Sequence, residues 1–107
     1  MVKISIFYPR SRGSNFDMDY YLKKHMPMSI DRLSTQKGFK GVSVERGLAG
    51  DRPGSDPTYV ALCHYVFESI EDFMAAFAPY AAGLQSDMRN YTDIMPVIQL
   101  SQVEIMK

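Results

Sequence analysis

The chain has almost no cysteine, no excess of either charge and no long apolar run, and each shortage excludes a class of protein. Cys63 is the single cysteine among 107 residues, so no internal disulfide can form, and a reducing cytoplasm is the expected location. Twelve acidic and twelve basic side chains cancel, and the longest basic run is Lys23-Lys24, which argues against a nucleic-acid partner. No apolar run approaches the ~20 residues that span a bilayer, and the N-terminus does not resemble a signal peptide. A membrane partner is therefore not expected.

Motifs for metals and nucleotides are also missing. His25 and His64 are the only histidines, and no His-x-His or cysteine pair accompanies them, so no metal site is expected. No glycine-rich phosphate loop is present, which argues against a reductase that binds a nucleotide by itself. Cys63 lies in an apolar segment, where it is interpreted as a small core residue rather than a nucleophile.

Four segments are predicted to be β-strands. Alternation of apolar and polar residues predicts a strand over Val2–Tyr8, and a second is predicted over about Phe39–Leu48. The nearly all-apolar segment Tyr59–Phe67 is typical of a strand covered on both faces. The last strand is predicted over Met95–Met106, with a bulge or bend near Ser101-Gln102, where the apolar parity changes.

The first helix is predicted to carry a histidine to its own end. Asp17 is a suitable N-cap, and Pro27 disfavours helical geometry at the residue before it, so the helix should end near His25. The imidazole would then lie at a helix C-terminus, where the dipole favours its protonated form. Pro27 is expected to open a short second helical segment. The buried stripe of the first helix is predicted to consist of Met18, Tyr21, Leu22 and His25.

A later helix is predicted to begin after Ser69. This residue is a good N-cap, and Asp72 stands at the capping-box position three residues on. Pro79 should kink the helix or split it in two. The predicted buried stripe consists of Ile70, Phe73, Met74, Phe77 and Leu84.

The predicted order is therefore β-α-β-β-α-β, a single α+β domain over residues 1–107. With both helices on one face of a four-stranded antiparallel sheet, this is the ferredoxin-like arrangement. The first and third strands carry apolar residues on both faces, yet no further element is available to cover the second face. Packing of this face against an identical subunit would bury it, so a homodimer is expected.

The chain resembles the EthD family, named for ethyl tert-butyl ether degradation, within the dimeric α/β-barrel superfamily. The most specific matching segments are Phe16–Pro27 (FDMDYYLKKHMP) and Tyr91–Val103 (YTDIMPVIQLSQV). Tyr8-Pro9, Gly41–Gly50 (GVSVERGLAG), Pro57–Phe67 (PTYVALCHYVF) and Ser69–Phe77 (SIEDFMAAF) also match, so that the resemblance extends over essentially the whole chain.

The resemblance implies a dimeric α/β barrel, in which two sheets close together and each subunit holds a cavity. It also implies a role as a reductase or an accessory protein in ether-degrading oxygenase systems, although this role does not specify a reaction mechanism. Related barrels include monooxygenases, lactone isomerases, polyketide cyclases and haem proteins, and fold alone does not choose among them. A haem held by one axial histidine is an alternative that the superfamily implies. Relatives commonly carry a histidine where this chain has Tyr80, which is neutral at pH 7.

Histidines and tyrosines are the candidate site residues. His25 and His64 are predicted to be catalytic, because imidazole exchanges protons near neutral pH. Tyrosine can donate a hydrogen bond to a developing oxyanion. For each residue the alternative is structural: a packed tyrosine, a hydrogen-bonded core histidine, or, at Asp93, a turn cap rather than a partner of histidine. The predicted substrate-binding residues are Tyr8, Tyr21, Tyr80 and Tyr91.

Three functions follow from these residues. The preferred one is an enzyme or enzyme-accessory protein that transfers protons on a small hydrophobic or aromatic, oxygenated molecule, by oxidoreductase-associated or isomerase- or cyclase-like chemistry. No cofactor is required in this interpretation. The second is a non-catalytic module that binds a hydrophobic metabolite or haem for a partner oxygenase. The third is a purely structural dimer subunit.

Overall fold

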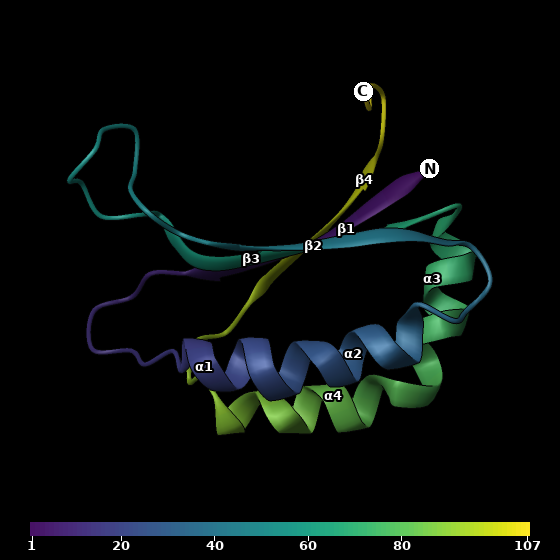
Figure 1. Cartoon of the computed structure of the whole chain (residues 1–107), viewed down its shortest axis with the longest axis horizontal. Helices are drawn as coiled ribbons and strands as arrows, with labels where there is room; N and C mark the ends of the chain where they lie inside the picture. Colours follow the sequence, from purple (N-terminus) through teal and green to yellow (C-terminus); the bar gives the residue numbers. More distant parts are fainter.

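The structure is a computed structural model that describes all residues, 1–107, and it contains one sheet with helices on one side (Figure 1). The strands are β1 (Val2–Pro9), β2 (Phe39–Arg46), β3 (Tyr59–Phe67) and β4 (Val97–Gln102). They form an antiparallel sheet in the order β2-β3-β1-β4. The predicted ferredoxin-like α+β fold is therefore confirmed.

The strand boundaries follow the apolar pattern closely at the centre of the sheet and less closely at its edges. β3 has the predicted bounds, because its long apolar run is paired on both sides. β2 ends at Arg46 rather than Leu48, and β4 spans only Val97–Gln102. Of the bulge or bend predicted near Ser101-Gln102, no bulge is present, because the pairing of β4 with β1 is regular. The strand ends at Gln102, and the chain bends just beyond it, at Glu104.

The first helical layer does not end at His25. It runs without a break through α1 (Met18–Tyr20), the π-helical turn η1 (Tyr21–His25) and α2 (Met26–Leu33). The Met26 N–H donates to the Tyr21 carbonyl five residues back, so the turn is wider than an α-turn just before Pro27. A proline ring collides with a carbonyl one α-turn earlier, and the wider turn lets the helix pass the proline. Asp17 is the predicted N-cap, accepting a hydrogen bond from the Tyr20 N–H at 3.1 Å.

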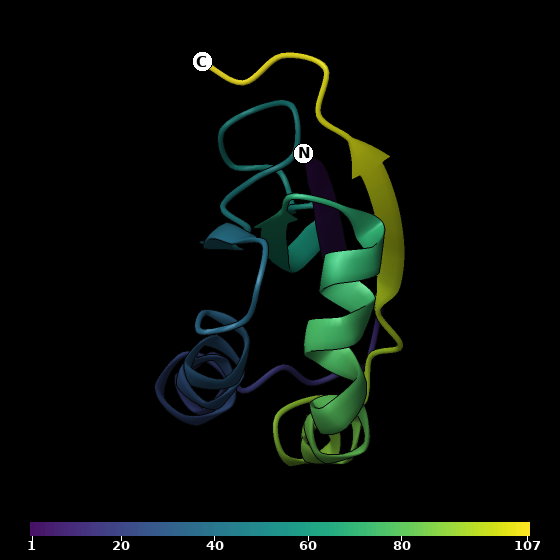
Figure 2. The ribbon, with the colours of Figure 1, turned by 90° about the vertical axis from the view of Figure 1, so that its right-hand side faces the viewer.

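The second helical layer begins at the predicted cap and is divided near Pro79. It comprises α3 (Ile70–Phe77), η2 (Ala78–Tyr80), α4 (Ala81–Asp87) and η3 (Met88–Asn90), and the Ser69 hydroxyl accepts from the Asp72 N–H. Figure 2 shows α4 lying beside the first helical layer, under the sheet. Phe73 and Leu84 are buried as predicted. Ile70 and Met74 are 40% and 55% exposed, so the buried face of α3 is narrower than the predicted stripe.

The hydrophobic core lies between the helices and one sheet face, and Cys63 is a buried member of it. The opposite face carries no helix (Figures 1 and 2). Alternation along β1 and β3 places Phe7, Leu62 and His64 on this open sheet face. None of the helices is both long and apolar enough to cross a bilayer.

Candidate functional site

An apolar cavity of about 140 Å³ lies between the helices and the sheet. Thirteen of its 17 lining residues are hydrophobic, and the few polar side chains come from β1, β3 and both helical layers. A cavity of ~150 Å³ holds a benzene-sized molecule, so one ring with small substituents matches this space. The side chains with polar atoms at the wall are Tyr8, Tyr21, His25, Ser29, Cys63, Tyr65 and Gln85.

The π-helical turn determines which side chains of the first helical layer reach the cavity. Tyr21 and His25 stand at its two ends, and their rings are nearly parallel at 15° with centroids 5.9 Å apart. Met26 and Ser29 follow on α2 and also line the cavity. Tyr21, His25 and Ser29 are all less than one-tenth exposed. The wider turn therefore presents a phenol, an imidazole and an alcohol to one space.

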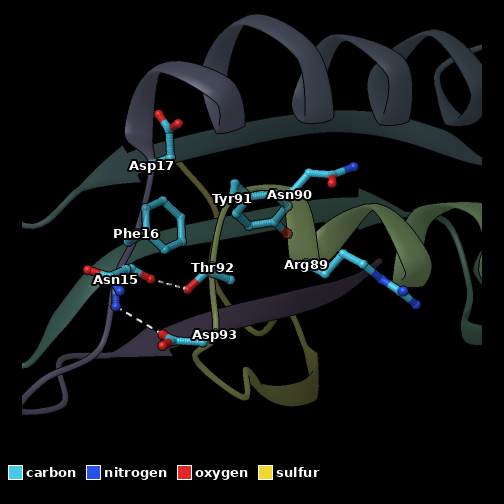
Figure 3. Close-up of a pocket in the computed structure, with 8 residues that line it drawn as sticks. All are labelled: Asn15, Phe16, Asp17, Arg89, Asn90, Tyr91, Thr92 and Asp93. Atoms are coloured by element: carbon cyan, nitrogen blue, oxygen red, sulfur yellow. Dashed lines mark hydrogen bonds between the residues drawn. The ribbon is translucent and has the colours of Figure 1, made fainter.

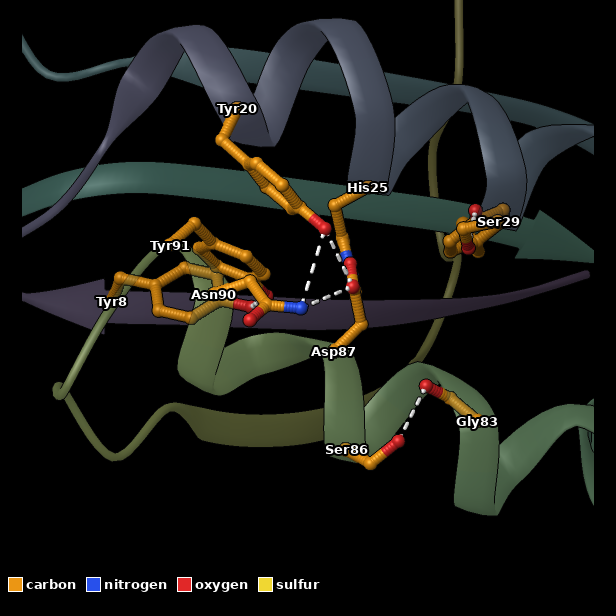
Figure 4. Close-up of polar contacts among 10 residues, drawn as sticks. Tyr8, Tyr20, His25, Ser29, Gly83, Ser86, Asp87, Asn90 and Tyr91 are labelled. Atoms are coloured by element: carbon orange, nitrogen blue, oxygen red, sulfur yellow. Dashed lines mark hydrogen bonds and ion pairs between the residues drawn. The ribbon is translucent and has the colours of Figure 1, made fainter.

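His25 is held by a carboxylate from the second helical layer (Figure 4). Its Nδ1 lies 2.9 Å from Oδ2 of Asp87, the last residue of α4. The other carboxylate oxygen, Oδ1, accepts from the Tyr20 hydroxyl at 2.7 Å and from the Asn90 side-chain amide at 2.9 Å. Three donors thus fix the carboxylate, and the carboxylate fixes the imidazole.

The pKa values of this pair favour a neutral imidazole and an ionised carboxylate. Burial lowers the pKa of His25 below its usual value and outweighs the opposite effect of Asp87. Burial acts to raise the pKa of Asp87, but hydrogen bonds from Asn90, His25 and Tyr20 together lower it. The Nδ1–H therefore donates to the carboxylate, and Nε2 carries a lone pair. Nε2 has no hydrogen-bond partner in the structure. The prediction that a helix dipole favours protonated His25 is wrong, because the helix continues past this residue.

Two pairs of hydroxyl groups flank the cavity. The Tyr8 and Tyr91 hydroxyls are 2.7 Å apart, and those of Ser29 and Tyr65 are 2.5 Å apart. Burial raises the pKa of Tyr8 to about 12, and it also raises the pKa values of Tyr65 and Tyr91. All of these phenols are neutral at pH 7, so they can donate hydrogen bonds but do not supply negative charge.

Four of the six predicted site residues lie together. Tyr8, Tyr21 and His25 line the cavity, and Tyr91 packs against His25 with ring centroids 4.6 Å apart. Tyr91 also borders a shallow polar hollow at the surface (Figure 3). In that hollow Asp93 accepts a hydrogen bond from the Asn15 N–H. Asp93 thus holds the loop that contains Asn15, in agreement with a structural role rather than a role as the partner of a histidine.

His64 and Tyr80 lie elsewhere. His64 is on the open sheet face, where its Nδ1 is 2.7 Å from the Ser5 hydroxyl and its Nε2 is 3.5 Å from Glu45. The ring of Tyr80 lies under the Arg32 guanidinium, 5.4 Å from the ring centroid, and does not line the cavity. Neither residue is therefore placed to act together with His25 in this cavity.

Sequence analysis did not identify Asp87 or the hydroxyls of Ser29 and Tyr65. Asp87 is 62 positions from His25, and only the packing of two helical layers brings them together. A usable signal for Asp87 was its place as an acidic residue at the C-terminal end of a helix, where the dipole disfavours a negative charge. Such a residue needs a compensating partner.

The residues present do not form a recognisable cofactor site. No cluster of three or more His, Cys, Asp or Glu side chains is arranged to hold a metal ion. Haem does not fit the cavity of about 140 Å³, because pockets for even drug-sized ligands are ~300–1,000 Å³.

The fold and the site define an α+β protein with the ferredoxin-like arrangement, an apolar cavity and one histidine held by a carboxylate. The EthD domain matches residues 14–94, and the chain belongs to the EthD family. An EthD-like protein from Ralstonia eutropha JMP134 is 40% identical, with a TM-score of 0.89 over 99% of this chain and 94% of that one. No match was found among curated protein sequences.

More distant structures share the fold alone. An EthD family protein from Bacillus halodurans C-125 is 15% identical, with a TM-score of 0.71 over 96% of this chain and 98% of its own. SnoaB, a cofactor-independent oxygenase from Streptomyces nogalater, is 14% identical, with a TM-score of 0.64 over 98% of this chain and 93% of its own.

Proposed function

We propose that this protein binds a small apolar molecule bearing oxygen and transfers a proton on it, with His25 as the general base and acid. One observation carries the proposal: a buried imidazole has one nitrogen held by Asp87 and the other unpartnered, at the wall of an apolar cavity. A carboxylate that accepts from one ring nitrogen fixes the tautomer and leaves the second nitrogen to accept a proton.

The lowered pKa of His25 suits the role of base. A general base must be neutral at the working pH, and a pKa below the usual value keeps the imidazole unprotonated. When Nε2 accepts a proton, the adjacent carboxylate stabilises the imidazolium, so the proton can later be returned. The apolar wall excludes water, which strengthens both interactions.

The oxygenase SnoaB shows that the fold supports chemistry without a cofactor. Removal of a proton from a carbon or phenol next to a carbonyl gives an electron-rich anion, which is the form that a cofactor-free reaction requires. A role within a degradative oxygenase or reductase system, including ether degradation, belongs to this proposal. The binding-only alternative lacks a specific use for the Asp87–His25 pair.

We further propose that the protein is a homodimer formed through the open sheet face. The support is the residue pattern: Phe7, Leu62 and Val66 share a face that no helix of the chain covers. An identical face would bury them in a sheet-on-sheet contact.

Proton exchange into heavy water tests the catalytic proposal without knowledge of the natural substrate. Cyclohexanone is a single-ring ketone with exchangeable C–H groups beside its carbonyl, and NMR follows their loss. We expect the wild-type protein to accelerate exchange and His25→Gln to lose at least ~10²-fold of that acceleration. His64→Gln is the matched control and should retain it. Equal exchange by His25→Gln and the wild type would refute the assignment.

A further inference from the structure

The hydroxyl of Tyr21 is the one fully enclosed side-chain nitrogen or oxygen atom of the protein that has no hydrogen-bond partner, whereas the unpaired Nε2 of His25 is not fully enclosed. Tyr21 is 1% exposed and lines the cavity. Buried polar groups are nearly always paired, so an unpaired one requires an explanation. A phenylalanine would fill the same space without this loss, because a tyrosine differs from it only by the hydroxyl.

The neighbouring groups do not satisfy this hydroxyl. The other phenols of the cavity are each engaged with a hydroxyl, Tyr8 with Tyr91 and Tyr65 with Ser29. The Cys63 sulfur is the one group within the protein towards which the Tyr21 hydroxyl can donate, and sulfur is only a weak acceptor. Inside the protein, therefore, the Tyr21 O–H lacks a strong acceptor.

The π-helical turn brings two complementary polar groups without a hydrogen-bond partner to the cavity. Nε2 of His25 carries a lone pair and accepts a proton, whereas the Tyr21 hydroxyl carries a proton and donates a hydrogen bond. Their rings stack on the same side of the helix. A ligand with an acidic C–H or O–H group and a carbonyl oxygen a few bonds away would engage both.

We propose that Tyr21 is a specificity-determining residue that donates a hydrogen bond to a carbonyl oxygen of the ligand, so that the cavity selects a cyclic or aromatic ketone over a hydrocarbon of the same shape. This rests on the proposed function. In the reaction, the C–H bond breaks and the proton moves to Nε2 of His25. The electron pair moves onto the carbonyl oxygen, where the Tyr21 hydroxyl stabilises the resulting enolate.

The wall of the cavity can give the ligand access to this hydroxyl. Tyr21 is sealed from water in the free protein, and Met26 and Met88 form part of the surrounding wall. Methionine side chains are unbranched and adapt to irregular shapes. Their methyl groups also provide NMR probes at the site.

Two isosteric ligands test the proposal directly. Cyclohexanone and methylidenecyclohexane differ only in the replacement of the carbonyl oxygen by a CH₂ group, and each is titrated against protein with ¹³C-labelled methionine methyls. A ketone gives up hydrogen bonds to water when it enters an apolar cavity and a hydrocarbon does not, so the informative quantity is the ratio of the two affinities. We expect Tyr21→Phe to shift this ratio about fivefold towards the hydrocarbon relative to the wild type, the usual effect of losing one neutral hydrogen bond. Tyr80→Phe removes a hydroxyl outside the cavity and should keep the wild-type preference.

Each result has a separate meaning. An affinity ratio that is the same in Tyr21→Phe as in the wild type overturns the role of Tyr21 while ligand binding stands. Binding of neither molecule overturns the proposed function, and the inference falls with it. The ligand-free melting temperature gives an independent check: Tyr21→Phe should match or exceed the wild type. A clear decrease would assign the hydroxyl a structural role instead.

Discussion

At the scale of single residues, the site depends on one contact between helical layers. The Nδ1 of His25 and the carboxylate of Asp87 are 2.9 Å apart, and both side chains are largely buried. Removal of the carboxylate would leave the imidazole buried without a partner for its N–H. Asp87 therefore acts on the reaction through His25, as a positioning residue.

Asp87→Asn should lower the pKa of His25 further. Burial already holds this pKa below the usual value of 6.5, and the carboxylate is the group that raises it. With the carboxylate replaced by a neutral amide, only the lowering effect remains. Histidine titration followed by ¹⁵N NMR measures the shift, and the same spectra report which nitrogen carries the proton.

Asp93→Asn is the control for this prediction, because Asp93 accepts from the Asn15 N–H and not from His25. Its His25 titration should match that of the wild type. An Asp87→Asn protein with an unchanged or higher His25 pKa would contradict the proposed coupling between the two residues.

At the scale of secondary-structure elements, local signals predicted the ends of helices better than their interiors. The Ser69 cap and the break at Pro79 follow from side-chain chemistry within a few residues, and both are present. The helix end predicted just before Pro27 is absent. A proline normally ends a helix, but the wider π-helical turn accommodates this one. The wider turn of η1 has no local sequence signal, and the sequence marks Asp87 only as an acidic residue at a helix end, without indicating that it contacts His25.

The Ser69 cap makes a measurable contribution to stability. Its hydroxyl accepts from the Asp72 N–H at 3.1 Å, which satisfies one of the first free donors of α3. We expect Ser69→Ala to lower the free energy of unfolding by ~1 kcal/mol. Urea denaturation monitored by circular dichroism provides the measurement.

Ser86→Ala is the matched substitution within α4. Its hydroxyl donates to the Gly83 carbonyl on an exposed surface, so its loss should be neutral or slightly stabilising. If both variants lose the same stability, the effect of Ser69→Ala is not due to capping.

At the scale of the whole molecule, the two sheet faces have different environments. One face packs on the helices and contains the core, whereas the other is open and carries both apolar residues and the His64 cluster with Ser5 and Glu45. The strand pattern was sufficient to predict an uncovered face. The pattern was not sufficient to place His64 on it, because β3 is apolar on both sides and gives no sign of which side faces the helices.

Leu62→Glu should weaken the proposed homodimer. Leu62 pairs with Phe7 across β1 and β3 at the centre of the open sheet face, and a buried unpaired carboxylate is strongly disfavoured. Sedimentation velocity across a dilution series should show a monomer at concentrations where the wild type is a dimer. Met74→Glu places the same charge on α3, away from this face, and should sediment as the wild type does. A wild-type chain that remains a folded monomer at all concentrations would refute the dimer.

The π-helical turn also makes the site sensitive to the length of the chain. Each residue of a regular helix rotates the next by about 100°, so loss of one residue within η1 would turn the segment before it relative to the segment after it. Tyr21 would leave the cavity while Ser29 stayed, or Ser29 would leave while Tyr21 stayed. The adjoining α-helical segments would remain well formed. In the corresponding gene, an in-frame deletion of one codon in this turn would thus do more damage than most substitutions there.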